Sequence, residues 1–159
     1  MKNIIKTIRT TFLILLIPFL YSACNFIAAG SYPLAEYYEF NTTTDELIEK
    51  ANIFKKKNPT YKVFTYIEDG NIEEVLGRQH EYDYTLHFYF EDIDKKIHCV
   101  IKGNRIGLTG IEEGVTIFGD WKTINTKDLS EKENEEIKKK FETEILDKLG
   151  EWERVKTRW

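Results

Sequence analysis

The sequence predicts an α+β fold in which an antiparallel meander of four or five strands carries two helices packed on one face. Three observations support this prediction: a capped amphipathic segment near each end of the domain, a ten-residue run of strict alternation at 82–91, and tight turns between short apolar segments. Charged residues make up 31% and aromatic residues 14% of the chain, a balance that favours a packed core over disorder.

The first helix is predicted over residues 43–58. Thr43 can cap its N-terminus, and Glu46, three residues later, completes the capping-box pattern. The Asn58-Pro59 pair ends the segment, because proline disfavours a helical conformation in the residue before it. Helical spacing predicts a buried stripe formed by Leu47, Ala51 and Phe54.

The second helix is predicted over residues 130–149 by the same signals. Ser130 and Glu133 form a second capping-box pattern, and Gly150 follows the last apolar position. The predicted core stripe consists of Ile137, Phe141, Ile145 and Leu149.

The strands are predicted between the two helices. In residues 82–91 aromatic and aliphatic side chains alternate with polar ones, which is typical of a half-buried antiparallel strand. The other expected strands are 61–67, 96–102, 105–111 and 115–121, whereas 72–81 is the longest irregular stretch, with a short helical turn expected before Gly77.

The polar face of strand 82–91 contains the candidate functional residues. If the hairpin turns about Ile93-Asp94, Tyr89 pairs with His98, and His87 becomes a diagonal neighbour of His98 on the same face. We take Asp83, His87, Tyr89 and His98 as the candidate partner-binding face. Zinc binding by the two histidines and a carboxylate is the alternative chemistry for this polar face. No spaced metal-ligand motif supports it, so no metal and no cofactor are predicted.

Other enzymatic chemistry has little support in the sequence. After residue 24 the only serines are Ser31 and Ser130, and neither lies on a strand-to-helix elbow. Cys99 is expected to be a buried thiol on the face of Ile97 and Ile101, because His98 points to the opposite side. No catalytic residues are therefore predicted, and the chain is expected not to be an enzyme.

The first 24 residues form a separate unit. Lys2, Lys6 and Arg9 precede an apolar run at 12–20, which is too short to cross a bilayer and is followed by small residues and Cys24. The sequence Tyr21-Ser22-Ala23-Cys24 resembles the signal of bacterial lipoproteins. The resemblance implies that residues 1–23 are removed, that the Cys24 thiol receives diacylglycerol, and that the new amine receives a palmitate-type acyl chain.

This resemblance implies a domain plan and a location. Residues 24–41 would be a lipidated tether and 42–159 a single α+β domain, with the aromatic second half of the tether expected to pack as a first strand rather than await a partner. The protein would be anchored to a membrane of the bacterial cell envelope, facing the periplasm.

The charge balance limits the possible partners. Residues 1–23 carry three positive and no negative charges, so their removal takes the net charge from −4 to −7. An acidic surface repels phosphate backbones, so nucleic acid is not expected as a partner. The leading hypothesis is a lipoprotein that binds a protein, with an immunity or inhibitor protein as one specific form. A lipoprotein that holds a small ligand between sheet and helices, and a metal-dependent enzyme, are the alternatives.

Overall fold

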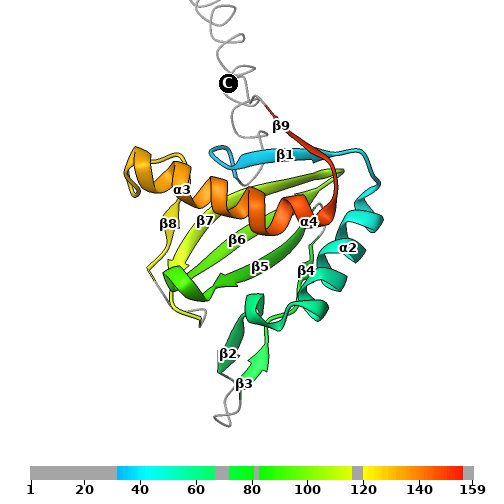
Figure 1. Cartoon of the computed structure of the whole chain (residues 1–159), viewed down its shortest axis with the longest axis horizontal. Helices are drawn as coiled ribbons and strands as arrows, with labels where there is room; N and C mark the ends of the chain where they lie inside the picture. The colour runs from blue at the N-terminus through cyan, green and yellow to red at the C-terminus, as the bar shows by residue number, and fades with distance from the viewer. Residues whose placement is uncertain (1–31, 67–71, 81–82, 116–119, 156–159) are drawn as a thin grey trace, which may run out of the picture. The chain divides into compact units, whose positions relative to one another are not determined.

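The computed structural model describes residues 32–66, 72–80, 83–115 and 120–155. It confirms the α+β class: a mainly antiparallel seven-stranded sheet packs against two long helical segments (Figure 1). The compact unit starts at Leu34 and runs to the end of the chain. The predicted signal and lipidation site, residues 1–24, lie outside the described residues.

The strands form one large and one small sheet. The large sheet has the order β4-β5-β6-β7-β1-β9, and β8 pairs with β7 beyond the end of β1. Its members are β1 (Glu36–Phe40), β4 (Arg78–Gln79), β5 (Tyr84–Phe90), β6 (Lys95–Lys102), β7 (Arg105–Glu113), β8 (Lys122–Thr123) and β9 (Trp152–Arg154). The small sheet is a hairpin of β2 (Phe64–Tyr66) and β3 (Ile72–Glu74).

Both long helices begin where the capping patterns predict. Helix α2 (Thr44–Lys57) is capped by Thr43 and helix α3 (Glu131–Phe141) by Ser130, and each N-terminus has a complete capping box. The predicted second helix is not uniform, because a π-helical segment (Glu142–Leu146) separates α3 from the last turn, α4 (Asp147–Leu149). This wider turn keeps Ile145, Leu146 and Leu149 in the core.

The main core lies between one face of the sheet and the helices. Phe88 of β5 contacts Phe54 of α2 and Phe141 of α3, and Phe141 also packs on Tyr38 of β1. In Figure 1 the helices α2, α3 and α4 lie on the same side of the large sheet. The opposite side of the sheet, called the open face below, carries the other set of alternating side chains.

Several sequence expectations need correction. The large sheet has seven strands rather than four or five. The strand expected in the second half of the tether is present as β1, and β4 and β9 also join the sheet, whereas the strand expected at 61–67 lies in the small sheet as β2. In the stretch expected to be irregular, residues 72–74 form β3 and residues 78–79 form β4, and no helical turn occurs among residues 72–80. The strand expected at 115–121 falls partly on undescribed residues 116–119, and β8 begins after it, at Lys122.

The β5–β6 register also differs from the expected one. A 3-10 turn (Glu91–Ile93) and Asp94, at φ +48°, connect the strands, so Lys95 already belongs to β6. As a result His87 pairs directly with His98, and Tyr89 pairs with Lys96. The shift of two residues leaves each side chain on its expected face, because side-chain direction repeats every two residues.

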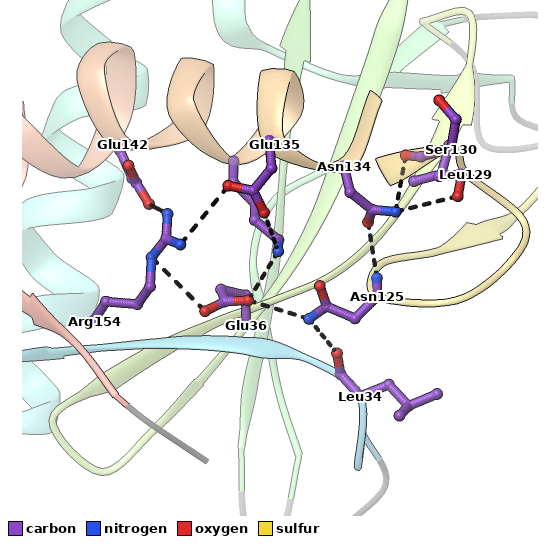
Figure 2. A network of polar contacts seen from close by, with 10 residues as sticks. Leu34, Glu36, Asn125, Leu129, Ser130, Asn134, Glu135, Glu142 and Arg154 are labelled. Carbon is purple, nitrogen blue, oxygen red and sulfur yellow. Dashed lines mark hydrogen bonds and ion pairs between the residues drawn. The ribbon is translucent and has the colours of Figure 1, made fainter. Parts of the chain in front are cut away.

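A polar network ties the two ends of the compact unit to α3. Figure 2 shows Arg154 of β9 reaching Glu142 and Glu36. The ammonium of Lys138 lies 3.2 Å from Glu36 and 2.8 Å from Glu135. On the other side of Glu36, the Asn125 amide donates to Glu36 and to the Leu34 carbonyl. Side-chain contacts therefore hold β1 and β9 to the helix layer. Backbone hydrogen bonds separately pair the two strands with each other.

Candidate protein-binding face

The open face brings together side chains from three strands and from the residue that precedes a fourth. His87 and Tyr89 come from β5, Lys96 and His98 from β6, Glu112 from β7, and Trp121 lies just before β8. Of the four predicted residues, His87, Tyr89 and His98 lie on this face. Asp83 lies just before β5, where its carbonyl accepts from His80 and Gln79.

A β-bulge places Glu112 on the open face. The β6–β7 register shifts between His98 and Cys99, and Thr109 of β7 donates its hydroxyl to the His98 carbonyl at 3.0 Å. The extra residue reverses the alternation of β7, so Leu108 and Ile111 both reach the core. Without the bulge, strict alternation would direct Glu112 toward the helices.

Glu112 organises a buried charge cluster on this face. Its carboxylate pairs with the ammonium of Lys96, whose side chain is 0% exposed, and the Glu112 side chain itself is 11% exposed. The same carboxylate oxygen lies 3.1 Å from Nε2 of His98. Because the Lys96 charge is compensated by Glu112, the pair can be buried on a sheet face that none of the described helices covers.

The two histidines pack edge to face across the β5–β6 ladder. Their ring centroids are 4.5 Å apart with an interplanar angle of 87°. Burial and then the neighbouring His98 and Lys96 lower the pKa of His87 to about 3. Burial also lowers the pKa of His98 to about 4, against the opposing effect of Glu112. Both rings are therefore neutral at pH 7, and among the described residues Nδ1 of His87 is buried without a hydrogen-bond partner.

Trp121 extends this row of rings toward solvent. Its ring centroid lies 4.4 Å from that of His98, and its indole N–H donates to the Thr123 hydroxyl at 3.0 Å. The ring rests on Gly110, where a Cβ would come within 2.6 Å of it. Trp121 is nevertheless 44% exposed. A large ring is therefore held in one orientation while much of its surface stays accessible.

The face does not have the geometry of a metal centre or a thiol active site. Within the described ranges no group of three histidine, cysteine or acidic residues is arranged to hold a metal ion. Cys99 points to the core as expected, and burial raises the pKa of its thiol. Ser130 serves as a helix cap, whereas Ser31 lies outside the described residues.

The described residues line three surface hollows of about 290–690 Å³: beside β9, on the outer side of α2, and beside the β5–β6 turn, where Tyr89 is one of the lining residues. None of the three is lined by the His87–His98 pair. In the portion of the chain that is described, no helix is long and apolar enough to cross a membrane.

Comparison of the chain with protein-family models, curated proteins and solved structures finds no match. Sequence reasoning missed Lys96, Glu112 and Trp121 as members of the face. The alternation of β6 already places Lys96 beside His98, whereas Glu112 depends on the bulge and Trp121 on the pairing of β8 with β7.

Proposed function

We propose that this protein is a non-enzymatic lipoprotein of the bacterial cell envelope that binds another protein through its open face. The observation that carries the proposal is Trp121, a half-exposed indole packed on Gly110 and next to the His87–His98 pair. Tryptophan is enriched among the residues that dominate binding energy in protein interfaces, and a side chain already ordered loses little entropy on binding.

The surroundings of Trp121 suit a protein better than a small ligand. Among the described residues, none of the three hollows is lined by His87, His98 or Trp121, whereas small-molecule sites are usually concave. The Lys96–Glu112 pair supplies charge that is already neutralised, so a partner can cover it without burying an unpaired ion. A neutralising partner of a toxin, as in immunity and inhibitor proteins, is the specific form that we favour.

The proposed anchor is the lipid on Cys24. Several acyl chains on one residue hold a protein to a bilayer far more firmly than one chain does. Intact mass of the protein from its native membrane tests this: we expect a chain that starts at Cys24 with added acyl mass. A Cys24→Ala variant should lose that mass and leave the membrane fraction. A cleaved chain without lipid would contradict the anchor.

Photo-crosslinking in the native cells tests the binding face. A photoreactive residue at position 89 or 121 should give the same specific protein adduct from either position. The matched control is Ile53, which is exposed to a similar degree on α2, on the helix side of the molecule. The proposal would be overturned if positions 89 and 121 gave no adduct, or if position 53 gave the same adduct to an equal extent.

Affinity measurement then tests the role of Trp121 itself. Once the adduct is identified, we expect Trp121→Ala to weaken binding by about thirtyfold, the effect of a typical hot-spot residue. The Ile53→Ala variant should leave the affinity unchanged. The melting temperatures of both variants, measured alongside, separate a loss of binding from a loss of folding.

A further inference from the structure

Strand β9 forms an edge of the large sheet. Among the described residues β9 pairs only with β1. A hollow of about 690 Å³ is lined by residues 151–155 together with Glu39, Phe40, Asn41 and Asn104, so it extends from β9 across β1 to the β6–β7 turn. It is separate from the open-face site that contains Trp121.

The backbone of β9 has pairing groups that point away from β1. The Val155 N–H donates to the Tyr37 carbonyl at 2.8 Å, so Val155 faces β1. Hydrogen-bonding direction alternates along an antiparallel strand, so Glu153 also faces β1, and the backbone groups of Trp152 and Arg154 point outward. None of the hydrogen bonds between described residues uses these outward groups.

The charges along this edge are unbalanced. Across the sheet Arg105 pairs with Glu39 at 2.7 Å, but Glu39 stands directly opposite Glu153 of β9. Like charges in opposite positions destabilise a strand pair. Glu151 lies two residues before Glu153 and therefore on the same side, and neither forms an ion pair within the described part of the chain.

Edge strand β9 is also held firmly in place. Arg154 contacts Glu142, and the Trp152 indole donates to Asp147 at 2.9 Å (Figure 2 shows the Arg154 contacts). A fixed edge with outward backbone groups is the arrangement that accepts an added strand. The carboxylates along this edge determine which kind of segment can bind. A second copy of β9, paired antiparallel about Glu153, would place the two Glu153 carboxylates opposite each other.

We propose that the β9 edge binds an extended cationic segment of a partner protein by strand addition. Backbone groups of Trp152 and Arg154 pair with the segment, and lysine or arginine side chains at alternate positions lie against Glu151 and Glu153. The row of charges across the sheet then runs from Arg105 through Glu39 and Glu153 to a cation of the bound segment. This inference is independent of the open face and of the lipid anchor.

Titration of the full chain in a neutral detergent with three peptides tests the inference. The probe is a nine-residue blocked peptide that alternates lysine and threonine. One comparison peptide has glutamate in place of lysine, and the other carries N-methyl groups on the backbone amides that would pair with β9. We expect only the first to bind and, at saturation, to slow hydrogen exchange of the outward Trp152 and Arg154 amides at least tenfold.

Charge variants provide the second readout. Glu151→Gln/Glu153→Gln should weaken binding about tenfold, and the loss should shrink at high salt because exposed charges are screened. The matched control, Glu49→Gln/Glu131→Gln, removes the same charge from exposed helix positions and should bind as the parent does. Equal weakening in the control, equal binding of the methylated peptide, or unchanged exchange at Trp152 and Arg154 would each overturn the proposal.

Discussion

At the scale of single residues, the His87–His98 pair differs most from what its sequence context suggests. A polar set opposite a core face is usually solvated, yet both imidazoles are half-buried and in edge contact. Their surroundings explain this: Glu112 satisfies Lys96 and approaches His98, and Trp121 shields His98. Burial keeps both rings neutral at pH 7, against the opposing effect of Glu112 on His98.

These neutral rings predict an acid-sensitive fold. Folding lowers both histidine pKa values from 6.5, to about 3 and about 4, so below pH 6.5 the unfolded chain binds protons that the folded chain excludes. The contribution of the two neutral rings to the free energy of unfolding should therefore have its full value above pH 6.5. It should fall as the pH decreases toward 4, by at most about 1.4 kcal/mol per pH unit for each ring.

Urea unfolding at a series of pH values measures this effect. The His87→Gln/His98→Gln variant should have a flatter curve between pH 6.5 and 4.5, a range above the titration of most carboxylates. The exposed His80 provides the control, because His80→Gln should leave the slope unchanged. Parallel curves for the parent and the double variant would show that the pair does not charge on unfolding.

At the scale of secondary-structure elements, helix α3 is joined to β1 by a buried ion pair. Nζ of Lys138 lies 3.2 Å from Glu36, and the Lys138 side chain is only 7% exposed. Removing one partner of such a pair leaves a buried charge, which costs about 3–5 kcal/mol, whereas removing both is often nearly neutral. The pair therefore contributes more to the position of β1 than to net stability.

We expect Lys138→Met to lower the free energy of unfolding by about 3 kcal/mol, and the added substitution Glu36→Gln to restore most of the loss. Chemical denaturation of the two single variants and the double variant gives the coupling directly. Lys132 is a matched control on the same helix: it is 84% exposed, and Lys132→Met should cost less than about 0.5 kcal/mol. Similar costs at Lys138 and Lys132 would refute the role of the pair.

At the scale of the whole molecule, β1 is a structural part of the domain rather than of a free tether. Tyr38 and Phe40 are both fully buried, and β1 lies between β7 and β9 in the sheet. The hydrophobic core extends from Tyr38 to Leu149, all within the compact unit that starts at Leu34. A boundary at residue 42 would therefore cut through the core.

Two truncated chains test this boundary. A chain of residues 34–159 should unfold cooperatively, because it retains every described core residue. A chain of residues 42–159 should lose cooperative unfolding, because it lacks two buried aromatic rings and exposes the edges of β7 and β9. Calorimetry or circular dichroism on heating distinguishes them, and equal melting temperatures would contradict the importance of β1.

The sequence by itself determined the features that depend on neighbouring residues. Both capping boxes, the stripe of Phe54, the alternation of β5 and the burial of Cys99 follow from spacing over a few positions. For the same reason His87, Tyr89 and His98 could be assigned to one face before their pairing was known.

Only the tertiary structure decided the features that depend on distant contacts. The bulge at Thr109, the pairing of β9 with β1, and the position of Trp121 over Gly110 have no local signal, because each is stabilised by residues far away in the chain. The direct pairing of His87 with His98 followed from the 3-10 turn before Asp94. Local chemistry thus selected the elements, whereas long-range packing selected their register and built the open face.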